Sequence, residues 1–324
     1  MPRGAGMSLL EINALDVDLP LTGSLFPSRR RISILADINL GLDRGETLGL
    51  VGESGSGKTT LARAILGLQA ISGGGIAFDG AALRTAKDFV PIRRRVAMMF
   101  QDAQASLSPR MSVGNLITEP LVIHRIAMPD RRALAAQLLA QVGLSGAMAA
   151  RYPHELSGGQ ARRVGVARAL ALDPALVIAD EPTAGLDVSV QAEILNLMSD
   201  LKDRMGLSYL IITHNLSLVR HIADRIAVMY LGRLVETGPT AAVFARPLHP
   251  YSFSLIAAEP QPDPRKRRAD LAIKGEIPSV LRRPQGCEFH TRCISATARC
   301  KVDVPVLRAI GPGRTASCHY AGAL

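Results

Sequence analysis

Three short apolar runs, each ending at polar or glycine-rich residues, are the clearest pattern in the chain. They cover residues 47–51, 176–179 and 209–213. Continuous apolar runs of this length are typical of strands that are buried on both faces of a parallel sheet. Residues 60–66 and about 161–172 instead read as helices. We therefore expect an α/β protein with a parallel arrangement of these strands.

A different periodicity appears between Gln101 and Glu155. Apolar residues there recur at helical spacing, at Val113, Leu116, Ile117, Leu134, Leu138, Leu139 and Val142. The spacing predicts a helical subdomain over about residues 102–156. Prolines often mark the ends of elements, so element boundaries are expected at Pro91, Pro109, Pro120 and Pro129.

A phosphate-binding loop (P-loop) is predicted at residues 52–59, which fit the pattern G-x-x-x-x-G-K-[ST]. The loop lies between a predicted strand and a predicted helix, so its glycines can turn backbone N–H groups toward a phosphate at a helix start. Lys58 can reach the terminal phosphates, and the Thr59 hydroxyl can bind Mg²⁺. The residues predicted to contact the nucleotide are Gly52, Glu53, Ser54, Gly55, Ser56, Gly57, Lys58, Thr59 and Thr60.

Two adjacent carboxylates, Asp180 and Glu181, end the second apolar run. Ligands of open α/β folds bind at the carboxyl edge of the sheet, where these two side chains are expected. Asp180 is predicted to hold Mg²⁺ and Glu181 to polarise the water that attacks the γ-phosphate. A solvated surface pair is the plain alternative, and the position directly after a buried strand argues against it.

Together these motifs resemble the motif set of ABC-transporter ATPases over about residues 35–245. The matching segments, in order, are the P-loop, Gln101, residues 156–160 (Leu-Ser-Gly-Gly-Gln), Asp180-Glu181, residues 184–187 and His214. The resemblance implies that Ser157, Gly158, Gly159 and Gln160 bind the ATP of an opposite subunit, so that two nucleotide domains work as a pair. It also implies that Gln101 senses Mg²⁺ and the attacking water, and that His214 contacts the γ-phosphate.

Some positions depart from the family pattern. Asn215 replaces the usual Asp after His214, and Ala184-Gly185 replaces the usual Ser-Ala. Neither change removes a group that hydrolysis needs, so a competent site is still expected. Phe26 is the nearest candidate for stacking on adenine, although an arginine-rich insertion at residues 28–31 obscures the register.

The C-terminal part resembles one branch of the family. Residues 247–320, and earlier segments such as Ser106–Arg110 and Asn115–Leu121, are similar to oligopeptide and dipeptide importer ATPases, most like their second subunit. The resemblance implies an ABC-type P-loop ATPase fold with a mixed sheet core, with the nucleotide-binding domain at residues 1–246 and a small extension at residues 247–324. It also implies a homologous ATPase as heterodimer partner, two membrane permeases and an extracytoplasmic substrate-binding protein. A peripheral location on the cytoplasmic face of the inner membrane is expected.

The extension contains all four cysteines of the chain, Cys287, Cys293, Cys300 and Cys318. Disulfides are disfavoured in the cytosol, and structural zinc sites usually show a closely spaced cysteine pair that is absent here. An iron–sulfur cluster needs four thiolates at varied spacing, and the peptide-importer resemblance implies a 4Fe-4S cluster at these positions. Zinc and free thiols remain as alternatives.

Composition constrains the function only a little. The chain of 324 residues is 48% apolar and lacks a long uninterrupted apolar run, so no membrane span is expected. The net charge of +10 could favour nucleic acid, but aromatic content is only 4% and the arginines are dispersed apart from runs at Arg29–Arg31, Arg93–Arg95 and Arg265–Arg268. The resemblance implies an ATPase that drives peptide import, and the composition gives no reason to expect a nucleic-acid partner. Nickel or another small ligand is the alternative cargo, and a soluble ABC ATPase that acts on nucleic acid is the rival class.

Overall fold

The computed structural model describes residues 8–21, 31–259 and 275–323. These residues form two compact units. The helical unit contains residues 43–46 and 85–212, and the P-loop unit contains the described parts of residues 7–42, 47–84 and 213–324. Each unit is described by itself.

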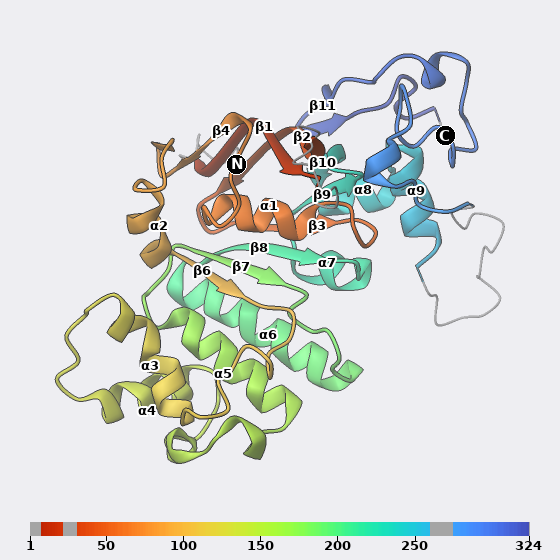
Figure 1. The fold of residues 1–324 in the computed structure, drawn as a ribbon. Coiled ribbons are helices and arrows are strands. Elements are labelled where there is room, and N and C mark those ends of the chain that lie inside the picture. Colours follow the sequence, from red (N-terminus) through yellow and green to blue (C-terminus); the bar gives the residue numbers. More distant parts are fainter. Residues whose placement is uncertain (1–7, 22–30, 260–274, 324) are drawn as a thin grey trace. The chain divides into compact units, whose positions relative to one another are not determined.

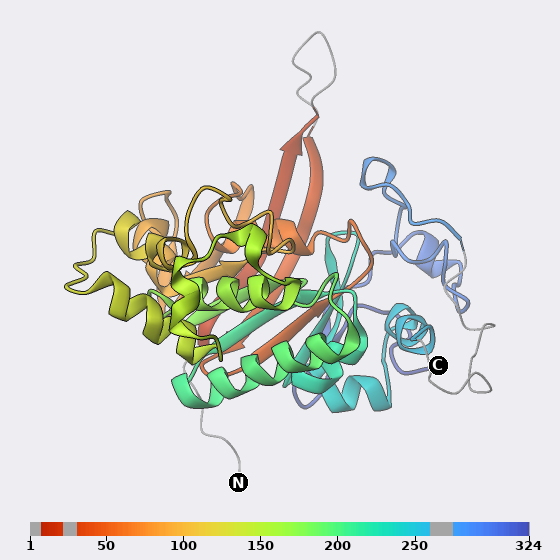
Figure 2. The same cartoon turned by 90° about the horizontal axis from the view of Figure 1, so that it is seen from below.

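The P-loop unit contains an antiparallel sheet in the order β2-β1-β4-β5. Its strands are β1 (Ser8–Pro20), β2 (Arg31–Asp43), β4 (Gly73–Phe78) and β5 (Ala81–Leu83). Figure 2 shows β1 and β2 running side by side as a long ribbon. Leu10 pairs with Phe78 across β1 and β4, and both side chains are buried.

A second sheet of the P-loop unit has the order β11-β12-β10-β9-β3. Its strands are β3 (Thr47–Val51), β9 (Arg225–Tyr230), β10 (Arg233–Pro239), β11 (Arg308–Gly311) and β12 (Arg314–Ala316). β3 and β9 are parallel, whereas β10 pairs antiparallel with β12. The C-terminal extension therefore adds two strands to the sheet that carries the P-loop. The helices of this unit are α1 (Lys58–Ile65), α7 (Leu216–Ile222), α8 (Thr240–Ala245) and α9 (Pro250–Ala257).

The helical unit is built on three parallel strands, β6 (Val96–Met99), β7 (Leu176–Asp180) and β8 (Ser208–Thr213). Every residue of β7 and β8 is buried, as expected for strands covered on both faces. Its helices are α2 (Phe89–Arg95), α3 (Val113–Ile123), α4 (Arg131–Gln141), α5 (Gly158–Leu170) and α6 (Val188–Met205). Figure 1 shows α3, α4 and α5 grouped together.

The three predicted strands are confirmed as β3, β7 and β8, and the predicted helical region contains α3 and α4. The expectation that Pro120 marks an element boundary is wrong, because Pro120 lies inside α3, whereas Pro91 lies at the start of α2. Pro91 lies in the first turn of its helix, where N–H groups have no helical partner. Pro120 removes one helical hydrogen bond near the end of α3, which stops at Ile123.

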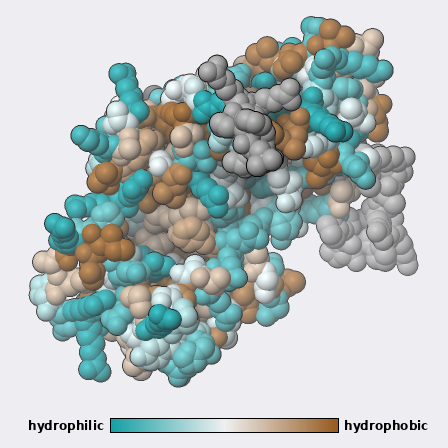
Figure 3. Space-filling view, in the orientation of Figure 1, coloured by the Kyte–Doolittle hydropathy of each residue, from teal (hydrophilic) through white to brown (hydrophobic). Residues whose placement is uncertain are grey.

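Hydrophobic and hydrophilic residues are interspersed on the molecular face shown in Figure 3. Across residues 8–21, 31–259 and 275–323, no helix combines the length and apolar character needed to cross a membrane.

A buried carboxylate connects β10 to the chain that follows it. Glu236 is 0% exposed and accepts hydrogen bonds from the backbone N–H groups of Leu248 (2.9 Å) and His249 (3.0 Å). Arg314 of β12 donates to the same carboxylate at 2.7 Å. One buried charge thus holds the start of α9 and the outer strands of the extension against β10.

We expect Glu236→Gln to lower the free energy of unfolding by about 3 kcal/mol, because breaking a buried ion pair leaves the remaining charge uncompensated. Urea unfolding followed by circular dichroism measures the change. The matched control is Glu193→Gln, whose partner Arg163 lies 3.0 Å away but whose own side chain is 61% exposed. The control should change stability by less than about 1 kcal/mol. Equal effects of the two substitutions would contradict the role given to Glu236.

Candidate nucleotide site and cysteine pocket

The loop between β3 and α1 has the backbone of a phosphate-binding loop. Gly55 and Gly57 adopt left-handed φ values of 76° and 103°. At Gly52 a Cβ atom would lie 2.1 Å from the carbonyl oxygen of Met229, so no larger residue fits there. Glycine meets both requirements of the loop, because it adopts a left-handed conformation without strain and has no Cβ atom to collide with a nearby backbone. The loop therefore delivers its N–H groups and the start of α1 to one place, as phosphate binding requires.

The ammonium group of Lys58 is held over the same loop. Its Nζ atom donates to the carbonyl oxygens of Gly52 (2.7 Å) and Glu53 (2.9 Å) and to the Ser56 hydroxyl (3.2 Å). Lys58 and Ser56 are buried, whereas Ser54 and Gly55 are exposed. Thr59 and Thr60 follow in the first turn of α1. All nine predicted nucleotide-contacting residues therefore lie in one continuous loop and helix start.

Asp180 and Glu181 lie at the carboxyl end of β7, as predicted. Asp180 is buried and pairs in register with Ile212 of β8. Glu181 has a φ of 49°, an uncommon left-handed conformation for a residue with a side chain, and its N–H donates to the Ile212 carbonyl at 2.8 Å. Such backbone strain tends to occur at functional sites. The backbone that carries both carboxylates is thus held in place at the end of β7.

Gln101 is exposed in the segment after β6, and one buried arginine fixes its backbone. Arg162 of α5 donates to the carbonyl oxygens of Phe100 (3.1 Å), Gln101 (3.0 Å) and Ala184 (3.1 Å). Burial lowers the pKa of Arg162, and nearby Asp102 opposes the shift. Arg162 therefore links the Gln101 segment to the turn after Glu181. No sequence signal singled out this residue.

The segment Ser157–Gln160 begins α5, three residues earlier than predicted. Ser157 caps the helix by accepting from the Gln160 N–H at 3.2 Å, and the Gln160 side chain accepts from the Ser157 N–H at 3.1 Å. Ser157 and Gly158 remain exposed. A Cβ atom at Gly159 would lie 2.9 Å from Val190, so glycine allows close packing against α6. An exposed, capped helix start is suited to bind an anion.

The two departures from the family pattern leave the local structure intact. Asn215 caps α7 by accepting from the Leu218 N–H at 3.2 Å, a role in which Asn and Asp are equivalent. His214 is exposed just before this cap. Asp187 caps α6, and hydrogen bonds from Ser189 and Val190 hold the pKa of its carboxyl below the usual range. Gly185 has a left-handed φ of 74°, which glycine adopts without strain.

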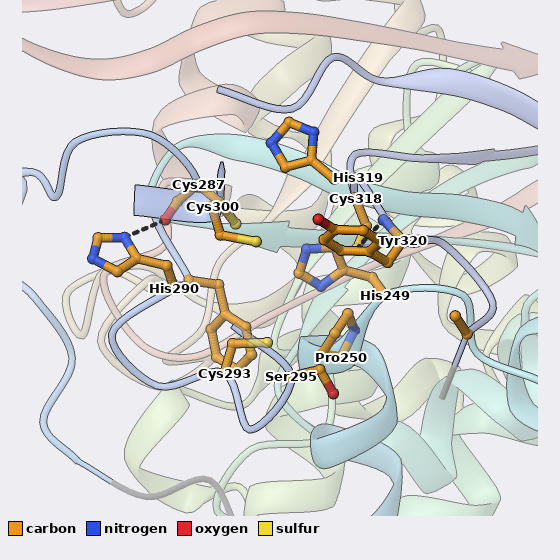
Figure 4. Close-up of a pocket in the computed structure, with 12 residues that line it drawn as sticks. His249, Pro250, Cys287, His290, Cys293, Ser295, Cys300, Cys318, His319 and Tyr320 are labelled. Carbon is orange, nitrogen blue, oxygen red and sulfur yellow. Dashed lines mark hydrogen bonds between the residues drawn. The ribbon is translucent and has the colours of Figure 1, made fainter. Parts of the chain in front are cut away.

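The four cysteines line one pocket of the extension (Figure 4). Burial, with a smaller contribution from neighbouring Cys300, Cys318 and Cys293, raises the pKa of Cys287 to about 12. Burial likewise raises the pKa of Cys293 and Cys318. In the part of the chain that the structure describes, however, no three Cys, His, Asp or Glu side chains are grouped closely enough to hold one metal ion. Four thiols are suitable donors for a metal centre, but in this structure they are not grouped as closely as the ligands of one metal ion.

The predicted P-loop residues and His214 belong to the P-loop unit, whereas Gln101, Ser157–Gln160, Asp180 and Glu181 belong to the helical unit. Within each unit these residues lie where the sequence predicts. Phe26, residues 28–30 and Arg265–Arg268 lie outside the described residues.

Sequence reasoning missed the residues that surround Glu53. The N–H of Glu53 donates to the Tyr251 hydroxyl at 2.9 Å. Its carboxylate accepts two hydrogen bonds from Arg292, at 2.6 and 2.9 Å. Arg292 lies 239 positions away in sequence, so no local pattern could have indicated this pair.

The loop, the helix start behind it and the carboxylates at a parallel strand end define a nucleotide-binding P-loop protein of the α/β class. Comparison with known proteins identifies its family. The ABC transporter family model matches residues 35–184, and the model of the oligopeptide/dipeptide transporter C-terminal region matches residues 235–300.

Full-length relatives agree with the family models. The chain is 45% identical to a probable peptide ABC transporter ATP-binding protein of Sinorhizobium fredii, over 96% of this chain and 90% of that protein. A putative peptide import ATP-binding protein of Brucella ovis is 46% identical, over 89% of this chain and 92% of the relative. Among solved structures, cbiO1 from Clostridium perfringens, part of an ABC transporter complex, is similar with a TM-score of 0.64 and 29% identity, covering 74% of this chain and 91% of cbiO1.

The chain therefore belongs to the ATP-binding proteins of ABC transporters, and it is an ATPase. The predicted ABC-type fold and the predicted similarity of the extension to oligopeptide/dipeptide transporters are confirmed.

We expect Arg162→Met to reduce ATP hydrolysis at least about tenfold, because small misplacements of site residues are costly to the reaction rate. Three carbonyl oxygens around Gln101 and Ala184 lose their donor in this variant. ATP affinity should be retained, since the P-loop is unchanged. Steady-state ATPase assays and fluorescent-nucleotide binding measure the two quantities.

The matched control is Arg163→Met, one position along the same helix, where the arginine pairs with exposed Glu193. This variant should hydrolyse ATP at nearly the wild-type rate. An equal loss of activity in both variants would indicate a general defect of α5 and would contradict the specific role of Arg162.

Proposed function

We propose that this chain is the ATP-hydrolysing subunit that energises import of dipeptides or oligopeptides. One observation carries the proposal: a single chain joins an ABC transporter domain to an oligopeptide/dipeptide-type C-terminal region. The names of the Sinorhizobium and Brucella relatives support peptides as the cargo. Nickel or another small ligand of the same branch is the second candidate cargo, since an ATPase subunit does not itself contact the cargo.

Each predicted site residue has a proposed part in the reaction. The N–H groups of residues 52–60 and the Lys58 ammonium bind the phosphates, while Thr59, Asp180 and Gln101 hold Mg²⁺. Glu181 polarises the attacking water, and Gln101 and His214 respond to the γ-phosphate. Ser157–Gln160 complete the site of a partner subunit. The exposed, capped start of α5 supports that last role.

The proposed assembly contains a homologous ATPase as heterodimer partner, two membrane permeases and an extracytoplasmic substrate-binding protein. The chain would then be a peripheral protein on the cytoplasmic face of the inner membrane. Residues 1–246 would form the nucleotide-binding domain and residues 247–324 the extension. Nucleic acid has no place in this assembly.

Transport assays test the cargo. Cells that lack the gene are complemented with the wild-type protein or with Glu181→Gln, and uptake of labelled dipeptides, longer peptides and nickel is measured. Peptide uptake that only the wild type restores would support the proposal. Peptide uptake that persists without the gene, together with lost nickel uptake, would move the cargo to nickel. DNA-stimulated ATP hydrolysis would instead favour the nucleic-acid class.

Glu181→Gln should lower the ATPase rate by about 100-fold or more, because a general base contributes a rate factor of this size. ATP affinity should stay within about threefold of the wild type, since the substitution removes no group that binds the phosphates. The ATPase rate and the dissociation constant for Mg-ATP are measured on the same preparation. Unchanged hydrolysis would show that Glu181 is not the base.

We further propose that Cys287, Cys293, Cys300 and Cys318 hold a 4Fe-4S cluster, with Zn²⁺ as the alternative. Four thiols around one pocket provide the donor set that such a cluster needs. Cys300 is buried and the other three cysteines are half-buried, and the chain has no cysteine elsewhere, which supports a shared role. The cluster would be structural or regulatory, because the four cysteines lie outside every nucleotide motif.

Anoxic purification followed by iron, sulfide and zinc analysis and absorption spectroscopy tests this site. About four iron atoms and four sulfides per chain are expected, and Cys300→Ser should lose them. A colourless protein with one zinc per chain would replace the cluster by zinc. A protein that contains neither iron nor zinc would show that the four cysteines are free thiols and would refute the proposed metal site.

A further inference from the structure

Glu53, the second residue of the P-loop, is held on three sides. Its N–H donates to the Tyr251 hydroxyl at 2.9 Å, and its carbonyl oxygen accepts from Lys58 Nζ at 2.9 Å. Its two carboxylate oxygens accept separate hydrogen bonds from Arg292, at 2.6 Å and 2.9 Å. Both Tyr251 and Arg292 come from the C-terminal part of the chain. The conformation of this P-loop residue thus depends on residues about 200 or more positions away.

The contact between Arg292 and Glu53 is a partly buried, bidentate ion pair. The Arg292 side chain is 4% exposed and that of Glu53 is 22% exposed. Bidentate arginine–carboxylate pairs fix orientation as well as charge. The hydrogen bonds to Glu53 also raise the pKa of Arg292 above its ordinary value. Arg292 therefore remains a cation at this position.

Arg292 is itself fixed by an aromatic cluster that joins the extension to the core. Its guanidinium lies 5.9 Å from the ring centre of Tyr230. Phe289 packs edge-on against both Tyr230 and Tyr251, each with ring centres 5.3 Å apart. Aromatic rings packed in this way leave little freedom for rearrangement. The position of the extension thereby determines where Arg292, and with it the Glu53 carboxylate, is held.

An ion pair at this place has an electrostatic consequence as well. ATP brings several negative charges to the P-loop, and an uncompensated carboxylate at its second residue would repel them. Arg292 compensates that carboxylate and holds it in one orientation. The same residue offers its carbonyl oxygen to Lys58, so a displaced Glu53 would also disturb the phosphate-binding lysine.

We propose that Arg292 is a positioning residue of the nucleotide site, which sets ATP affinity by neutralising and orienting Glu53. The extension then works as part of the P-loop rather than only as an attached module. This inference rests on the proposed role of the loop in binding ATP. It assigns no contact between Arg292 and the nucleotide.

Arg292→Gln tests the proposal in the full-length chain. The dissociation constant for Mg-ATP and the KM for ATP should rise about tenfold, whereas kcat should stay within about threefold, because ground-state and transition-state binding weaken together. Arg292→Lys keeps the charge but loses the bidentate geometry, so its affinity should fall between those of the wild type and Arg292→Gln. The double variant Glu53→Gln with Arg292→Gln should regain most of the affinity, since no uncompensated carboxylate remains.

Arg283→Gln is the matched control. Arg283 attaches the extension through Glu288 at 2.6 Å and through the Ser33 carbonyl at 2.7 Å, without a contact to the P-loop. It should leave the KM for ATP unchanged even where thermal stability falls.

Two outcomes would overturn the inference. One is an unchanged KM in Arg292→Gln while the wild type binds ATP. The other is an equal rise of KM in Arg283→Gln, which would show that Arg292 only attaches the extension to the rest of the chain. A wild-type protein that fails to bind ATP would instead refute the proposed function itself.

Discussion

Phosphate binding requires that several backbone N–H groups turn toward one point, and the rest of the nucleotide site depends on this constraint. The chain can meet it only with glycines, because Gly55 and Gly57 take left-handed conformations and Gly52 lies against the Met229 carbonyl. Within the P-loop, the Lys58 side chain bridges Gly52, Glu53 and Ser56, but glycines at three positions leave the loop few side chains of its own for rigidity. Its shape is fixed from outside, by β9 behind Gly52 and by the residues that hold Glu53.

Arginine–glutamate pairs provide much of that external support. Arg292 binds Glu53 of the P-loop, and Arg314 binds buried Glu236 of β10. A third glutamate, Glu288, accepts from two arginines, Arg233 and Arg283. In each pair one partner is almost fully buried, so removing the other would leave a charge that the protein interior cannot solvate. The extension is thus attached at a few charged points that tolerate little variation, and part of the basic excess of the sequence has a structural role.

The sequence allowed the prediction of features that depend on local pattern. The buried strands β3, β7 and β8 follow from apolar runs, and the P-loop follows from residue types at fixed spacing. The early start of α5 and the position of Pro120 inside α3 were not foreseen, because a capping interaction at Ser157 and the packing of a whole helix outweigh local propensity there. The contacts of Arg162, Glu236 and Arg292 join segments 12 to 239 positions apart. Such pairs depend on the tertiary fold, and a single sequence contains no signal for them.

The distribution of residues between the two compact units separates two kinds of contribution to the reaction. The groups proposed to bind phosphate, namely the loop N–H groups and Lys58, belong to the P-loop unit together with the cysteine-bearing extension. Glu181, which would act on water, and Arg162, which orders the Gln101 segment, belong to the helical unit. Because Arg292 binds the carboxylate of Glu53 in the P-loop, a change in the extension should alter how tightly ATP binds before it alters how fast bound ATP reacts. On the proposed roles, the extension is therefore suited to adjust nucleotide affinity, while the helical unit would set the rate of the chemical step.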